Sequence, residues 1–192
     1  MSREDIKQHI IESAIECIEE HGVQSVTVRD ITQRAGVNTA SINYYFGSKD
    51  ELIRQALEQT LENLFVDWED MLQEPDADLH EVFRFMLKEI LSGARRYPNI
   101  TKAHLYDPLI NNQYDGMFVR RLNSFLGKLA HFIHQQKDDG SLEAIHKNLI
   151  TIFSSAMFPA LMPALFEGFS GYNFHSDDQQ DEYIEYLLEK VI

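Results

Sequence analysis

A short polar run near residue 40 carries the residue types best suited to contacting nucleic-acid bases. Thr39-Ala40-Ser41 is followed at close spacing by Asn43, Tyr44 and Tyr45. On a helix, small side chains let the backbone approach base edges, and amide and hydroxyl groups exchange hydrogen bonds there. Lys49 follows at the start of the next expected helix, where its charge and the free peptide N–H groups both favour phosphate. These residues predict a surface that binds double-stranded DNA.

The net charge of the whole chain opposes this interpretation, because phosphate contacts need Lys and Arg. The 192 residues include 17 Lys and Arg against 31 Asp and Glu, so the formal charge is 17 − 31 = −14. The window Gln24–Arg54 is the least acidic part, with four basic and three acidic side chains. An acidic body that stands more than about 8–10 Å from a duplex is screened from it. The alternative interpretation is that the acidity only confers solubility.

Other classes of function lack their characteristic residues. The single cysteine, Cys17, excludes an internal disulfide framework and a thiolate zinc site. No nucleophile elbow, phosphate-binding loop or dinucleotide fingerprint is present, so we expect no catalytic residue and no cofactor. His131 and His134 lie one turn apart, which is a weak indication of zinc. Surface or core histidines are the default interpretation, so we expect no metal.

The chain also lacks the apolar segments of a membrane or secreted protein. The longest apolar run, Ala156 to Phe166, has 11 residues and is too short to span a bilayer. The first ten residues contain no continuous apolar segment, so no secretory signal is visible. We therefore expect a cytoplasmic protein without membrane contact.

Helical periodicity runs through nearly the whole chain, and no alternation typical of strands is present. Gly22 is placed to end a first helix, and Thr27 with Asp30 to cap a second. Asn38 and Ser48 are placed to cap a short third helix and a long amphipathic fourth. The predicted fold class is therefore all-α.

The remaining elements follow from the same periodicity. The fourth and later helices are expected over residues 48–74, 78–97, 99–106, 114–137, 142–166 and 177–191, with an ordered loop over 167–176. Prolines are expected to stop the 99–106 helix at Pro108 and to bend the 142–166 helix at Pro159 and Pro163. This count gives about nine helices.

The second and third helices, joined by Ala35-Gly36-Val37, fit a helix-turn-helix inside a three-helix unit. The glycine permits a tight turn, and Ile42 and Phe46 are expected in the core of this unit. With these features, the sequence resembles the tetracycline-repressor (TetR) family of transcriptional regulators. The resemblance covers about residues 5–54. The matching runs are Val26-Thr27-Val28-Arg29-Asp30-Ile31, Ala35-Gly36-Val37, Ser41-Ile42-Asn43-Tyr44-Tyr45-Phe46 and Ser48-Lys49-Asp50-Glu51-Leu52.

The resemblance implies a role for each matching polar residue. Thr27, Lys49 and Tyr45 are expected to contact phosphate, and Arg29 a base or a phosphate. The base-reading surface is expected to consist of Thr39, Ala40, Ser41, Asn43 and Tyr44. In the alternative interpretation, the two tyrosines partly pack and Arg29 pairs with a surface acid. The tail before Ile6 is short, so we expect no basic arm for the minor groove.

The resemblance also implies two domains, a DNA reader over residues 1–47 and a ligand-binding and dimerisation domain over residues 48–192. A homodimer is expected through the last two helices, where Ile184, Leu187, Leu188 and Val191 form an apolar stripe. The alternative is that this stripe is buried within one chain. A pocket for a hydrophobic ligand, aromatic or acyl, is expected to be lined by Phe65, Trp68, Met86, His104, Phe118, Phe125 and Phe153. Each of these residues could instead be ordinary core.

The sequence thus predicts a DNA-binding transcriptional regulator, a repressor that binds a palindromic operator as a homodimer. A small hydrophobic effector is expected to release it. The alternative is an all-α small-molecule carrier or metal-dependent enzyme that does not act on DNA. Salt-sensitive, sequence-selective DNA binding distinguishes the two.

Overall fold

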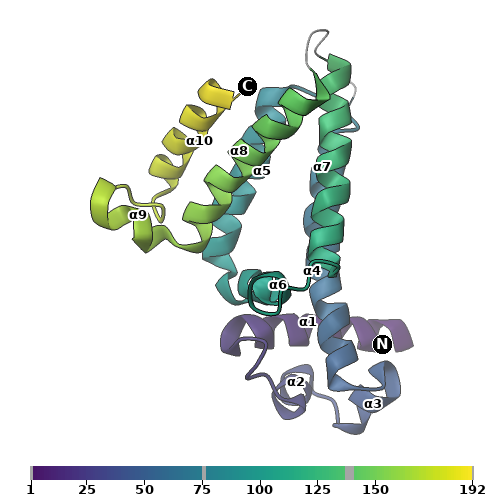
Figure 1. The fold of residues 1–192 in the computed structure, drawn as a ribbon. Coiled ribbons are helices and arrows are strands. Elements are labelled where there is room, and N and C mark those ends of the chain that lie inside the picture. Colours follow the sequence, from purple (N-terminus) through teal and green to yellow (C-terminus); the bar gives the residue numbers. More distant parts are fainter. Residues whose placement is uncertain (1, 75–76, 137–140, 192) are drawn as a thin grey trace. The chain divides into compact units, whose positions relative to one another are not determined.

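Helices account for all regular secondary structure in the part of the chain that the computed structural model describes, residues 2–74, 77–136 and 141–191. The predicted all-α class is confirmed (Figure 1). The described residues form ten helices: α1 (Arg3–His21), α2 (Val28–Ala35), α3 (Ala40–Phe46), α4 (Lys49–Met71), α5 (Leu79–Arg96), α6 (Pro98–Ile110), α7 (Met117–Gln136), α8 (Leu142–Leu161), α9 (Pro163–Ser170) and α10 (Asp177–Val191).

The helices are divided between two compact units. Unit 1 consists of Met1–Leu64 and Tyr97–Val119, and unit 2 of Phe65–Arg96 and Arg120–Ile192. Helices α4 and α7 contribute residues to both. The segment expected to read DNA lies wholly within unit 1, which also takes in the first part of α4 and all of α6.

Unit 1 is built around one apolar face of α1. Ile10, Ala14, Cys17 and Ile18 are buried there and pack in one cluster with residues of α2, α3, α4 and α6. The Glu19 carboxylate of α1 also accepts hydrogen bonds from the first free N–H groups of α6, at 3.2 Å from Asn99 N and 3.0 Å from Ile100 N. These N–H groups lack partners inside their own helix. A side chain of α1 therefore caps α6 and fixes it against the three-helix reader.

The chain departs from prediction where α8 meets α9. Helix α8 continues through Pro159 to Leu161, so Pro159 does not end the helix. The chain turns by 91° after Leu161, and Pro163 is the first residue of α9. Proline suits this position because its fixed φ favours a helix start and its missing N–H is not needed there. The expected loop is also wrong over residues 167–170, which continue α9 until Gly171 ends it in the left-handed conformation.

Two other boundaries differ from expectation or cannot be compared. Helix α6 continues through Pro108 to Ile110, so the predicted stop at this proline is wrong. Proline removes one hydrogen bond from a helix interior. The helix nevertheless continues past Pro108, and Asn111 N still donates to Asp107 O at 3.0 Å. The predicted helix end at Lys137 and the turn after it lie outside the described residues.

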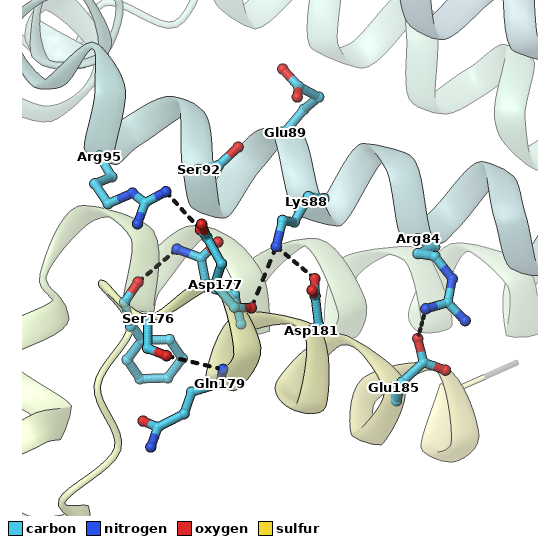
Figure 2. A network of polar contacts seen from close by, with 12 residues as sticks. Arg84, Lys88, Glu89, Ser92, Arg95, Ser176, Asp177, Gln179, Asp181 and Glu185 are labelled. Atoms are coloured by element: carbon cyan, nitrogen blue, oxygen red, sulfur yellow. Dashed lines mark hydrogen bonds and ion pairs between the residues drawn. The ribbon is translucent and has the colours of Figure 1, made fainter.

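In unit 2, α10 is held along α5 by a ladder of ion pairs (Figure 2). Arg84 pairs with Glu185, Lys88 with Asp181 at 2.6 Å, and Arg95 with Asp177 at 2.7 Å. The order of partners reverses along α10, which shows that the two helices run antiparallel. Each pair is partly exposed, so each contributes at most about 1 kcal/mol, and the ladder mainly sets register.

The apolar stripe of α10 faces its own chain. Ile184, Leu187 and Leu188 are buried within unit 2, and the side chain of Val191 lies outside the described residues. The interpretation that this stripe is buried inside one subunit is therefore confirmed for these three residues. Any contact of α10 with another subunit must use a different face.

No single helix in the described ranges is both long and apolar enough to cross a bilayer; α8 and α9 meet those criteria only as a pair, across their 91° bend.

Candidate nucleic-acid interface

Local hydrogen bonds set the entry of the helix-turn-helix. At the start of α2, Asp30 N donates to Thr27 Oγ1 at 3.2 Å and Thr27 N donates to Asp30 Oδ2 at 2.9 Å. This is the predicted capping box, and the hydrogen bonds from Thr27 lower the pKa of the Asp30 carboxyl. After α2, Gly36 adopts φ 64°, a left-handed conformation that L side chains rarely adopt, and the chain turns toward α3.

The first turn of α3 is capped as predicted by Asn38. Its Oδ1 accepts a hydrogen bond from Ser41 N at 3.0 Å and faces the Ser41 hydroxyl at 3.2 Å. Ile42 and Phe46 point into the core of unit 1, as predicted from their spacing. The opposite face of α3 is therefore turned outward.

The expected base-reading residues lie on that outward face. Thr39, Ala40, Asn43 and Tyr44 are exposed, Tyr44 by 65%, and Ser41 is half-buried. Tyr44 does not pack into the core, whereas Tyr45 is half-buried and packs against the core cluster. The two rings meet edge to face with centroids 4.9 Å apart. Tyr45 therefore packs between the core and the exposed ring of Tyr44.

Two cations of unit 1 differ in how far they are engaged by acids. Arg34 of α2 pairs with Glu16 at 3.3 Å and with Glu20, both on α1. The positive charge of Arg34 is therefore balanced by acidic side chains of the same unit. Arg29 is exposed one turn earlier, and among the described residues no ion pair of Arg29 is found. Arg29 thus keeps its guanidinium toward solvent.

The start of α4 presents Lys49. Glu51 N donates to Ser48 Oγ at 3.1 Å, which forms the first half of the expected capping box. The Glu51 carboxylate instead accepts hydrogen bonds from Arg54 Nη2 and Nε, at 2.7 and 2.9 Å, and from Gln55 Nε2 at 2.7 Å. These hydrogen bonds lower the pKa of Glu51 to about 2. Arg54 is neutralised locally by this acid, and half-exposed Lys49 stands at the N-terminal end of the helix.

Sequence reasoning missed two cations of α1 beside α3. The Arg3 guanidinium lies 5.1 Å from the Tyr44 ring centroid and 6.0 Å from that of Tyr45. Lys7 Nζ lies 6.0 Å from the Phe46 ring centroid. The i, i+4 spacing of Arg3 and Lys7 on a helix with a Ser2 cap was the signal in the sequence. Basic charge thus reaches α3 from the first turns of α1.

Five of the seven expected pocket residues are buried in unit 2, and the four aromatic ones among them pack together. Phe65, Trp68, Phe125 and Phe153 contact one another with ring centroids 5.2–6.3 Å apart. Together with Met86, they are all at least 93% buried, with exposed fractions from 0% to 7%. Trp68 Nε1 is buried and has no hydrogen-bond acceptor among the described residues. We name the four residues whose rings are in contact, Phe65, Trp68, Phe125 and Phe153, the aromatic cluster.

The other two expected pocket residues, His104 and Phe118, lie in unit 1. Their rings stack with centroids 6.3 Å apart, and His104 Nε2 lies 2.9 Å from Thr60 Oγ1. The Thr60 hydroxyl donates its hydrogen to Leu57 O at 2.9 Å, so it accepts from the imidazole and Nε2 carries the proton. Burial, which disfavours the charged ring, lowers the pKa of His104 to about 4.

This half-buried histidine predicts a specific pH dependence of stability. The native pKa of about 4 lies below the ordinary value of 6.5, so the unfolded chain binds more protons between these pH values. Stability due to His104 is therefore complete above pH 6.5 and is lost as pH falls toward 4, by about 2 kcal/mol between pH 7 and pH 5. Urea unfolding at both pH values should show a loss of stability that is larger in the wild type than in His104→Gln by about this amount.

Glutamine keeps an N–H donor for Thr60, so His104→Gln removes the titration with little change in contacts. The exposed His146 provides the matched control, and His146→Gln should follow the wild type at both pH values. Equal losses of stability in the wild type and His104→Gln would contradict this assignment.

The described residues contain no group of three His, Cys, Asp or Glu side chains that could hold a metal ion. His131 and His134 therefore belong to no such group in this part of the chain. The geometry of unit 1 instead presents a helix with small and polar side chains outward and with Arg3 over the ring of Tyr44, while Arg29 and Lys49 lie on the adjoining helices α2 and α4.

Comparison with known proteins agrees with this geometry. The family described as bacterial regulatory proteins, tetR family, matches residues 10–56, which include the whole helix-turn-helix. IcaR of Staphylococcus epidermidis, a negative transcriptional regulator of the icaADBC biofilm operon, is 27% identical over 92 residues, 48% of this chain and 49% of IcaR. The regulator BetI of Brucella suis is 34% identical over 126 residues, 62% of this chain and 63% of BetI.

The first curated relatives are matched over about half of their length or less. Solved structures extend the likeness of fold to the whole chain. A TetR-family regulator of Mesorhizobium loti has a TM-score of 0.72 at 12% identity and covers 100% of this chain and 97% of its own. FadR of Bacillus subtilis, solved with stearoyl-CoA, has a TM-score of 0.60 at 17% identity, with 96% and 97% covered. Residues 10–56 of this chain thus match the TetR family of bacterial regulatory proteins, and the whole chain shares its fold with solved TetR-family regulators.

Proposed function

We propose that the protein is a one-component transcriptional repressor that reads DNA with α3. The observation that carries this proposal is the two-faced character of α3. Ile42 and Phe46 anchor it in unit 1, while Thr39, Ala40, Asn43 and Tyr44 remain exposed. A helix held by its apolar face and exposing small and polar groups has the form needed to enter a major groove.

The residues of unit 1 take different roles in this proposal. Asn43, Ser41 and Tyr44 read base edges, together with the small Thr39 and Ala40. Thr27, Tyr45 and Lys49 contact phosphates, Arg29 contacts a base or a phosphate, and Arg3 contacts phosphate from α1. Arg3 also fixes Tyr44, because its guanidinium lies over the face of that ring. These cations lie on α1, α2 and α4 in a chain whose overall charge is −14.

In the proposed assembly, residues 1–47 are the reader and residues 48–192 form a dimerising sensor. One α3 contacts only half of a regulatory site. Two readers held about 34–36 Å apart match successive major grooves of a palindromic operator, and their joint binding is much stronger than that of either alone. The repressor assignment draws on the similarity to IcaR, which is a negative transcriptional regulator. The protein acts by binding rather than catalysis, in the cytoplasm, where its operator lies.

The proposed effector is a small hydrophobic molecule of the aromatic or acyl class that releases the protein from DNA. FadR of Bacillus subtilis, a structural neighbour, is described in complex with stearoyl-CoA. The aromatic cluster of unit 2 offers an apolar environment and one unused donor, Trp68 Nε1. An acyl ligand carries a carbonyl that could accept this hydrogen bond, and burying its chain supplies about 0.8 kcal/mol per methylene.

A titration with the DNA next to the protein's own gene tests this function. The purified full-length protein should shift this DNA and not a scrambled duplex of equal length, and affinity should fall steeply as salt rises. Stearoyl-CoA at micromolar concentration should release the shifted DNA and change the fluorescence of Trp68, the single tryptophan. Absence of any sequence-selective shift would favour the carrier interpretation, and release without a fluorescence change would place the effector outside the aromatic cluster.

A further inference from the structure

A groove in unit 2 is lined mainly by aromatic rings. It has a volume of about 1000 Å³ and lies between α8, α9, α10 and the segment that joins α9 to α10. None of the described residues that line the groove belongs to the aromatic cluster, so the groove is a separate candidate site. We name its rings the aromatic wall, which consists of Phe158, Phe166, Phe169, Tyr172, Phe174, Tyr183 and Tyr186. The first six rings lie next to one another, with centroids 5.2–6.5 Å apart between neighbours.

The charge of this lining is negative. Glu182 lines the groove, and no Lys, Arg or His side chain is among the described residues of its walls. Burial and, after it, the negative charge of Glu182 raise the pKa of the Tyr172 hydroxyl, so this carboxylate acts on the groove itself. Other acids of α10 are balanced elsewhere, because Asp177, Asp181 and Glu185 pair with cations of α5 (Figure 2). The groove therefore favours a positively charged ligand over an anion.

Four hydroxyl groups of the lining donate their hydrogens within the chain. They bond to main-chain carbonyl oxygens at 2.6–3.0 Å and belong to Ser154, Ser170, Tyr172 and Tyr183. Their oxygens keep lone pairs, so a ligand meets acceptors and no donor at these four positions. A carboxylate, phosphate or carbonyl group needs donors, and its burial without them is costly. A positively charged group, in contrast, meets electron-rich oxygens at all four.

One ring of the aromatic wall already carries a cation of the same chain. Lys190 Nζ lies 5.7 Å from the centroid of the Tyr186 ring. The face of an aromatic ring is its negative side, and it attracts an ammonium group within about 6 Å. Tyr186 is 56% exposed, so its ring remains accessible to a ligand in the groove. The side chain of Lys190 thus shows, with an alkylammonium group, the contact that a bound organic cation would make.

We propose that this groove is a binding site for a hydrophobic organic cation, a quaternary ammonium or phosphonium ion. The aromatic wall supplies ring faces and apolar contact, and Glu182 balances the charge. A quaternary cation has no N–H group, so its burial leaves no hydrogen-bond donor unsatisfied. The site is distinct from the aromatic cluster, where the acyl or aromatic effector of the proposed function binds, and it goes beyond that function.

Isothermal titration calorimetry of the full-length protein with two ions of the same shape tests this site. Tetraphenylphosphonium carries a positive charge and tetraphenylborate a negative one, so their difference in affinity reports charge alone. The phosphonium ion should bind with a stoichiometry of one per chain and a micromolar dissociation constant. The borate ion should bind at least about tenfold more weakly, because it meets Glu182 and the negative ring faces.

Two substitutions in the groove locate the binding. Glu182→Gln should raise the dissociation constant of the phosphonium ion about fivefold, since it removes an exposed charge partner. Tyr186→Leu keeps an apolar side chain and removes the ring face, and it should raise the constant about threefold. The control is Glu189→Gln, which removes the same charge from an exposed position on α10 outside the described lining. Its constant should stay within about twofold of the wild type.

Glu182 and Tyr186 are exposed, so both variants should keep the helical circular dichroism of the wild type, which separates loss of binding from loss of fold. Equal affinities for the two ions would overturn the inference, because the groove would then select only apolar surface. Equal losses in Glu182→Gln and Glu189→Gln would do the same, since the phosphonium ion would then follow the overall negative charge. If another subunit covers the groove, neither ion binds, and this result also refutes the site. Binding is measured directly, so the outcome is independent of whether the protein binds DNA.

Discussion

Replacing Phe125 by alanine should lower the free energy of unfolding by about 3–5 kcal/mol, the largest effect on stability expected from any single change in the aromatic cluster. Phe125 is fully buried and touches both Phe65 and Trp68, at centroid distances of 5.8 and 5.2 Å. Removing its ring takes away apolar contacts and leaves a cavity that the packed neighbours cannot fill. Urea unfolding followed by Trp68 fluorescence measures this decrease in the free energy of unfolding with a probe that contacts Phe125 directly.

Val66→Ala is the control for this experiment. Val66 lies on α4 between Phe65 and Trp68, but its side chain is 46% exposed. Its effect should stay below about 1 kcal/mol. All proteins are compared at one concentration, since a dimer's stability depends on concentration. A change below 1 kcal/mol in Phe125→Ala would show that the cluster can collapse or open at little cost, as a preformed pocket would.

Replacing Lys49 by alanine should weaken binding to every DNA sequence and lessen its dependence on salt. Losing one phosphate contact per subunit lowers the slope of log K against log salt by about 0.9, hence by about 1.8 for a dimer. The same relation gives a loss of about 30-fold in affinity at 0.15 M salt. Titrations of operator and scrambled duplexes at four salt concentrations measure both quantities.

The control is Lys102→Ala, which removes the same charge from an exposed position on α6 of the same unit. Its salt slope should equal that of the wild type. Asn43→Ala, in contrast, should change the preference among bases and leave the slope nearly unchanged, because base contacts release no counterions. Equal slopes for wild type and Lys49→Ala would remove Lys49 from the set of phosphate contacts.

Features that depend on neighbours in sequence were predicted correctly. The capping box of Thr27 and Asp30, the cap by Asn38 and the helix end at Gly22 involve partners three or four residues apart. The burial of Ile42 and Phe46 follows from their helical spacing, and the matching runs that carry the family resemblance are equally local. Such interactions are set by residue type and spacing, before any long-range contact forms.

Other features depend on contacts between distant segments, which spacing does not encode. Arg3 meets Tyr44 only because α1 packs beside α3, and His104 finds Thr60 across 44 positions of sequence. An amphipathic stripe shows that a helix face is buried but not against which surface. For this reason the sequence alone established an all-α chain with a helix-turn-helix. Only tertiary packing decided that the α10 stripe turns inward, while the α8–α9 corner leaves its apolar residues exposed.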